Sequence, residues 1–100
     1  MQQYNFTEVI MWEICQKVEL IEGFSTPKVY FDCLTYIQSL VDSGDFVFEA
    51  KDCKTDEVQD ECGHWIDDII SHVIRCKNCG QCFSSTAITY RGDGSFRKGR

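Results

Sequence analysis

The residues with the clearest chemical potential lie in segment 75–83, which reads RCKNCGQCF. Cys76 and Cys79 form a C-x-x-C motif, and Gly80 follows it directly. This spacing allows two thiolates of one tight turn to face a common centre, and a glycine can adopt the positive φ that such a turn requires. The motif therefore predicts one half of a zinc site, since a structural zinc site needs four ligands.

The other half of the predicted zinc site is a C-x-H pair, Cys62 and His64, which precedes the segment that leads into the motif. Cys53 is the reserve ligand. The alternative is a metal-free hairpin turn whose cysteines act as small hydrophobic residues. Cys82 extends the motif to C-x-x-C-x-x-C, which also admits an iron–sulfur cluster, although such a cluster needs a fourth cysteine.

Two enzymatic interpretations use the same side chains. A thiol oxidoreductase of the thioredoxin type places its C-x-x-C at a helix N-terminus, where the helix dipole lowers the thiol pKa. Here residues typical of strands follow Gly80, so this function is only the second alternative. A hydrolytic pair of His64 or His72 with a cysteine is geometrically open, but nothing in the sequence activates one. We therefore predict a protein that is not an enzyme.

Acidic residues crowd the segment 51–64 and continue just beyond it, while the apolar residues thin out. This pattern predicts a solvated loop, and its plain interpretation is a surface that confers solubility. The functional interpretation is a surface that attracts a basic partner. The candidate partner-binding residues are Asp52, Asp56, Glu57, Asp60, Glu61, Asp67 and Asp68.

Charge is unevenly distributed along the chain. Residues 1–68 hold 15 acids and 4 bases, whereas residues 69–100 hold 1 acid and 6 bases. The larger part would repel nucleic acid, which makes nucleic acid an unlikely main partner. The basic end, with Arg97, Lys98 and Arg100, could contact phosphate, but we interpret it as a counterweight to the acidic segment.

The composition predicts one folded domain, 1–100, since 43% of the residues are hydrophobic and 13% are aromatic. No segment approaches the roughly 20 apolar residues that span a bilayer. The N-terminus lacks the basic and apolar regions of a secretory signal, so we expect a cytoplasmic protein. In that compartment the seven cysteines, an odd number, are expected to be reduced or metal-bound.

Two helices are predicted in the N-terminal half. The first has Asn5 and Glu8 as a capping box, apolar residues at helical spacing over 6–21, and Gly23 as the residue that ends it. The second runs over 27–43, with an N-cap at Ser25–Thr26, proline in its first position and Gly44 after its end. Its predicted buried face comprises Tyr30, Cys33, Leu34, Ile37, Leu40 and Val41.

The rest of the chain predicts strands. Residues 45–50 alternate with period two, and residues 81–90 form a good return strand. Segment 65–76 fits a helix or a strand, and we favour a strand from Ile69 because the segment is β-branched and enters the C-x-x-C-G turn. A turn at 91–94 and a short strand at 95–97 complete an α+β fold. In that fold two N-terminal helices pack on a three- to four-stranded antiparallel sheet with a C-x-x-C knuckle.

The C-terminal third, HVIRCKNCGQCFSSTAITYRGDGSFRKGR, combines a strand, the C-x-x-C-G knuckle with a following aromatic residue, and a Tyr-x-Gly-x-Gly-Ser-Phe-like turn. It resembles the C-terminal hairpin of small bacterial immunity proteins from polymorphic or contact-dependent toxin systems. The resemblance covers residues 72–100 and implies a non-enzymatic protein that binds one cognate toxin domain inside the cell. It assigns roles only to Cys76 and Cys79.

The leading hypothesis is therefore an immunity protein that inhibits a nuclease-type toxin domain. A nuclease domain needs a basic surface to bind nucleic acid, and the seven acidic candidates can use that same electrostatic field for fast association. The alternative is a zinc-knuckle adaptor that contacts nucleic acid or a protein through residues 75–100.

Overall fold

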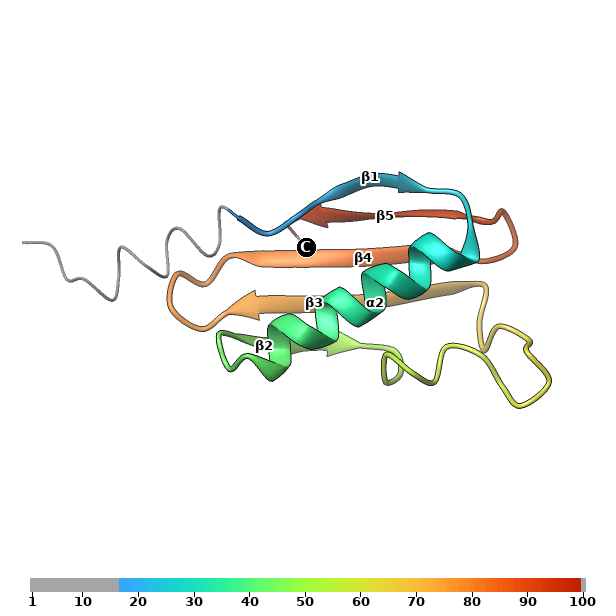
Figure 1. The fold of residues 1–100 in the computed structure, drawn as a ribbon, viewed down its shortest axis with the longest axis horizontal. Coiled ribbons are helices and arrows are strands. Elements are labelled where there is room, and N and C mark those ends of the chain that lie inside the picture. Colours follow the sequence, from blue (N-terminus) through green and yellow to red (C-terminus); the bar gives the residue numbers. More distant parts are fainter. Residues whose placement is uncertain (1–16, 100) are drawn as a thin grey trace, which may run out of the picture.

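The computed structural model describes residues 17–99, which form an α+β fold with one helix packed on a five-stranded antiparallel sheet (Figure 1). The elements in chain order are β1 (Ile21–Phe24), α2 (Pro27–Asp42), β2 (Phe46–Lys51), β3 (Ile69–Cys76), β4 (Cys82–Ile88) and β5 (Asp93–Lys98).

The sheet has the strand order β1-β5-β4-β3-β2, and every neighbouring pair is antiparallel. Strands β2 to β5 follow one another as a meander, while β1 returns to pair with β5 at the far edge. Helix α2 crosses one face of the sheet and carries the chain from the β1 edge to the β2 edge (Figure 1). A single helix therefore covers the core side of the sheet in the described range.

Helix α2 begins and ends where local chemistry requires. The Thr26 hydroxyl accepts a hydrogen bond from the Val29 amide at 3.3 Å, and Pro27 occupies the first helical position. The helix ends at a Ser43 cap, and Gly44 then takes a φ of 91°. The prediction of a helix over 27–43 is confirmed. No helix within residues 17–99 is long and apolar enough to cross a membrane.

The core lies between α2 and the sheet. Helix α2 buries four residues, Tyr30, Cys33, Leu34 and Ile37. The sheet contributes the inward side chains of the meander, among them Phe46, Ile70, Ile74, Cys76, Phe83, Ala87 and Phe96. Buried and half-buried residues alternate along β4, which is the period-two pattern that predicts a strand. The strand predicted from Ile69 is confirmed.

Three expectations about the fold need correction. The first predicted helix lies mainly in residues 1–16, outside the described residues, but its expected end does not hold, because Ile21 and Gly23 lie in strand β1. The sheet has five strands instead of three or four, because β1 pairs with β5 across a long sequence separation. Finally, the turn occupies residues 89–92, so that β5 already begins at Asp93.

Candidate binding surface

The four residues predicted to bind zinc lie at opposite ends of strand β3 (Figure 1). Cys76 ends β3 and Cys79 is in the turn that follows, whereas Cys62 and His64 precede the strand. Eight strand residues extend over roughly 25 Å, so the two pairs do not meet. Within residues 17–99, no three or more Cys, His, Asp or Glu side chains gather as a metal ion would require.

The C-x-x-C motif forms the turn between β3 and β4. The Gly80 amide donates to the Cys76 carbonyl at 3.0 Å, the Cys76 amide donates to the Gln81 carbonyl at 2.9 Å, and Gly80 has a φ of 75°. Cys76 is fully buried in the core, whereas Cys79 is exposed. Backbone hydrogen bonds therefore close this turn, and its two thiols have different surroundings.

This difference leads to a test of the knuckle. Cys76→Ser is expected to lower the free energy of unfolding by about 2 kcal/mol, because it buries a hydroxyl among apolar side chains. Cys79→Ser is expected to change it by less than about 0.5 kcal/mol, as is usual on a surface. Urea unfolding of both variants measures the difference. Equal losses, together with zinc that copurifies with the untagged protein, would instead establish a metal knuckle.

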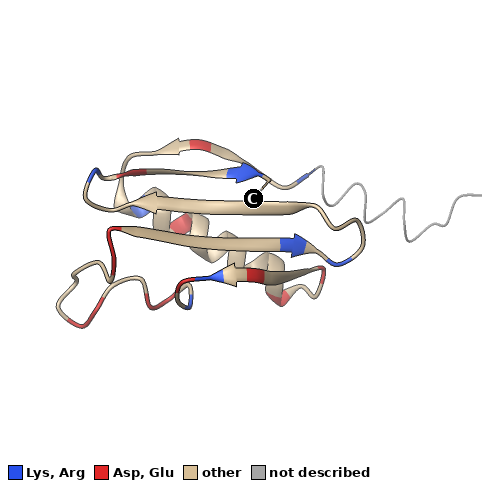
Figure 2. Cartoon of the chain, turned by 180° about the vertical axis from the view of Figure 1, so that it is seen from behind, with Lys and Arg blue, Asp and Glu red and all other residues tan. Residues whose placement is uncertain are grey.

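All seven acidic candidates are exposed, and they lie in the segment that connects β2 to β3, at one end of the sheet (Figure 2). Three of them also accept hydrogen bonds from the backbone, and one of these is Asp67, which accepts from the Asp68 amide at 2.7 Å. The Asp52 carboxylate accepts from the Ser71 amide at 2.8 Å, and one Asp60 oxygen accepts from the amides of Cys62 and His64, each at 2.9 Å. The carboxylates of Asp56 and Glu61 make no hydrogen bond or ion pair with any residue in 17–99.

Two apolar residues anchor this acidic segment to the core. Val58 is only 2% exposed, and Trp65 packs against the core cluster and forms a bridge with Gln59. The Ile66 amide also donates to the Val58 carbonyl at 3.1 Å. The solvated loop expected over 51–64 is thus a folded segment whose acidic side chains point outward.

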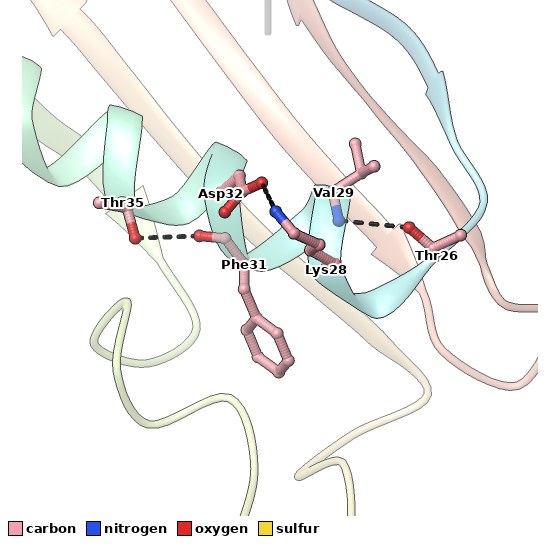
Figure 3. Close-up of polar contacts among 6 residues, drawn as sticks. All are labelled: Thr26, Lys28, Val29, Phe31, Asp32 and Thr35. Carbon is pink, nitrogen blue, oxygen red and sulfur yellow. Dashed lines mark hydrogen bonds and ion pairs between the residues drawn. The ribbon is translucent and has the colours of Figure 1, made fainter.

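An aromatic patch adjoins the acidic segment. Phe31 projects from the first half of α2 toward this segment (Figure 3), and its ring stacks on Trp65 with centroids 5.7 Å apart. Phe31 is 37% exposed and Ile66 is 45% exposed. We call Phe31, Trp65, Ile66 and the seven acidic candidates the aromatic–acidic face.

A groove extends this face along the helix. It has a volume of about 1090 Å³ and lies between α2 and the segment that follows β2. Phe31, Leu34 and Phe48 supply apolar walls. The charged residues of the lining have both signs: Asp42, Lys51, Lys54, Asp56 and Asp60. A partner that contacts the aromatic–acidic face therefore meets a concave surface next to it.

One group of basic side chains lies at the opposite end of the sheet. Lys77 is in the β3–β4 turn, and Arg97 and Lys98 are at the end of β5 (Figure 2). Arg75, close by, pairs with Glu49 at 2.9 Å. The two ends of the sheet differ mainly in the acidic candidates, because four other basic residues lie nearer the aromatic patch: Lys28, Lys51, Lys54 and Arg91.

A polar cluster that the sequence did not reveal lies under α2. His72 and Ser85 are fully buried and face each other on β3 and β4. The His72 Nε2 group donates to the Cys53 carbonyl at 2.9 Å and lies 4.0 Å from the Cys53 sulfur. Within the described residues, His72 Nδ1 and the Tyr30 hydroxyl are buried without a hydrogen-bond partner, and the buried Ser85 hydroxyl lies beside the Cys33 thiol.

Burial keeps the ionisable members of this cluster uncharged. It lowers the pKa of His72, although the hydrogen bond to the Cys53 carbonyl opposes the change. It raises the pKa of the Cys33 thiol to about 11, and burial together with the Asp52 charge raises the pKa of Cys53. A neutral thiol next to a neutral imidazole is not an activated nucleophile. We therefore expect the cluster to affect the free energy of unfolding.

His72 should make stability depend on pH. Its pKa is lowered in the folded state, so below the ordinary value of about 6.5 the unfolded chain binds more protons. The stability contribution is complete above that pH and is lost as the pH falls, by at most about 1.4 kcal/mol per pH unit for one proton.

His72→Gln keeps a donor for the Cys53 carbonyl and is expected to flatten the stability profile between about pH 7 and pH 5. Urea unfolding across that range measures it. The wild-type profile over the same range is the reference. A profile that is equally steep in His72→Gln would contradict the assignment.

Part of this cluster was visible in the sequence. The alternation of Ile70, His72 and Ile74 places His72 on the buried side of β3. Nothing local connects His72 with Cys53, which lies just after β2, or with Ser85, which lies in β4. Comparison with known proteins adds no precedent for the site, because no family model, no curated protein and no solved structure matches the chain.

Proposed function

We propose that this protein is a small binding protein that covers a basic partner with its aromatic–acidic face, most concretely an immunity protein that inhibits a nuclease-type toxin domain inside the cell. The observation that carries the proposal is the stacked Phe31–Trp65 pair beside outward acidic side chains. Protein interfaces typically combine a desolvated aromatic centre with a polar rim.

The electrostatics support the same partner. Asp56 and Glu61 expose carboxylates that take no part in holding the fold, so their charge is available to an approaching surface. A nuclease domain carries a positive surface, which such a field attracts over a Debye length of about 8 Å at physiological salt. The basic residues at the far end of the sheet would then point away from the partner.

Coexpression tests the function directly. The C-terminal toxin domain of a large secreted protein encoded next to this gene should stop growth when it is expressed alone, and this chain should restore growth and abolish nuclease activity in vitro. Failure to restore growth, when the chain is folded and present in excess, would refute the inhibitor function.

The acidic charge is expected to control the association rate. Asp56→Lys/Glu61→Lys should slow association with that toxin domain about tenfold at low ionic strength, because it replaces attraction with repulsion. The melting temperature should hardly change, since neither carboxylate holds the fold. Stopped-flow measurement over a salt series checks this.

Glu19→Lys/Glu22→Lys is the matched control, because it changes the net charge equally at exposed positions before and within β1. Its association rate should stay within about twofold of the wild type, because the local field decides the encounter. Equal slowing by both double variants would mean that net charge alone matters and that the aromatic–acidic face has no special part.

The basic end favours a second candidate, the adaptor that contacts nucleic acid through residues 75–100. Lys77, Arg97 and Lys98 gather there. Phosphate contacts by such a cluster must weaken steeply with salt. Titration of the protein with single- and double-stranded nucleic acid over a salt series distinguishes the candidates, since an acidic inhibitor should not bind at any salt concentration.

A further inference from the structure

We propose that a small pocket beside Trp65 accepts one aliphatic side chain, of leucine size, from a basic segment of the partner. The pocket lies between the start of α2, Trp65 and the β4–β5 turn, and its volume is about 90 Å³. This is several times the volume that one water molecule needs. The inference rests on the proposed function and specifies what the partner must carry.

The walls of the pocket are mainly apolar. Phe24 and Tyr30 stack with ring centroids 5.2 Å apart, and Tyr30 meets Trp65 at 5.8 Å. Ala87 and Ile88 of β4 form the opposite wall. Burial of an aliphatic side chain among such groups is favourable by about 25 cal/mol per Å² of apolar surface.

Three polar side chains around the pocket are already engaged, whereas the buried Tyr30 hydroxyl has no hydrogen-bond partner within residues 17–99. The Thr26 hydroxyl accepts from the Val29 amide, and the Thr89 hydroxyl donates to the Asp67 carbonyl at 2.7 Å. Asp93 pairs with Arg91 at 3.1 Å. Since the positive end of α2 also lies here, a bound cation and a bound anion would each meet one unfavourable charge. A neutral side chain fits this environment better than a charged one.

The charges around the pocket indicate which residues flank the aliphatic residue in the partner's segment. The backbone of Thr89 donates to the Asp68 carbonyl at 2.8 Å, which places the acidic pair Asp67 and Asp68 beside the pocket. Trp65 joins the pocket to Phe31, so the pocket is continuous with the aromatic–acidic face. Charge complementarity therefore favours basic residues on both sides of the aliphatic one.

Three acetylated and amidated tripeptides test the pocket in the full-length protein: Lys-Leu-Lys, Lys-Ala-Lys and Glu-Leu-Glu. Amide correlation spectra should give a dissociation constant for Lys-Leu-Lys that is about tenfold lower than for Lys-Ala-Lys, with shifts at Ala87, Gly92 and the Trp65 indole. Glu-Leu-Glu should bind more weakly than Lys-Leu-Lys, because the acidic pair repels it.

Two variants fill the pocket from β4. Ala87→Leu should remove the advantage of the leucine peptide over the alanine peptide. Ala87→Val is the second variant, for the case in which the leucine variant does not fold. Valine suits a strand, and this variant should reduce the advantage. Ser84→Ala, three residues away on the other face of β4, is the control and should keep the advantage.

The outcomes separate the pocket from the proposed function. Equal binding of the leucine and alanine peptides overturns the pocket, as does a leucine advantage that persists in both Ala87 variants or shifts that centre on Phe31. If both lysine peptides still bind better than Glu-Leu-Glu, the acidic surface stands without the pocket.

Discussion

Gly94→Ala is expected to lower the free energy of unfolding by about 3 kcal/mol, which is large for a single methyl group. A Cβ at this position would collide with the Phe24 ring and with the Thr86 carbonyl oxygen. Neither neighbour can yield easily, because Thr86 lies in the β4 backbone and Phe24 is only 3% exposed under Tyr30. The expected loss of stability comes from the close contacts of Gly94 with Phe24 of β1 and Thr86 of β4, not from a positive φ.

Thermal or urea unfolding measures this loss, and the melting temperature should fall by on the order of 15 °C. Gly23→Ala is the matched control in the neighbouring strand, since its Cβ would lie 3.8 Å from the Gly94 carbonyl oxygen, an ordinary contact. It should change stability by less than about 0.5 kcal/mol. Equal losses at the two glycines would contradict the packing of β1 against β5.

The sequence predicted the helix and the strands that are determined by neighbouring residues, such as helix caps and alternating apolar residues. Thr26, Pro27 and Gly44 bound α2, and strand periodicity located β3 and β4 to within a residue or two. Strand β1 was not predicted, because it has only four residues and pairs with β5, which is distant in the sequence. The residues next to β1 therefore do not indicate this pairing. Gly23 and Gly94 looked like residues of a helix end and a turn, although both lie in strands.

The candidate site was predictable in its charges but not in its shape. Acidic residues in a polar run mark a surface on any fold, whereas the packing of Phe31 on Trp65 depends on how α2 crosses the sheet. Val58 was missed because it is an isolated apolar residue within an acidic segment. The predicted four-ligand zinc site required the chain to fold back so that Cys62 and His64 approach the C-x-x-C motif. The extended strand β3 instead separates the two pairs of residues.

Phe31→Ala is expected to weaken binding of the toxin domain about thirtyfold, or about 2 kcal/mol, because it removes the exposed ring at the centre of the aromatic–acidic face. The variant should remain folded, since more than a third of the residue is already exposed. Leu20→Ala is the control, because Leu20 is similarly exposed at 48% but lies just before β1.

Isothermal titration of the wild type and these two variants with the toxin domain tests the central claim most directly. The aromatic–acidic face predicts a dissociation constant raised about thirtyfold by Phe31→Ala and changed less than about twofold by Leu20→Ala. Unchanged affinity in folded Phe31→Ala, or an equal loss in Leu20→Ala, would show that the partner binds elsewhere on the chain.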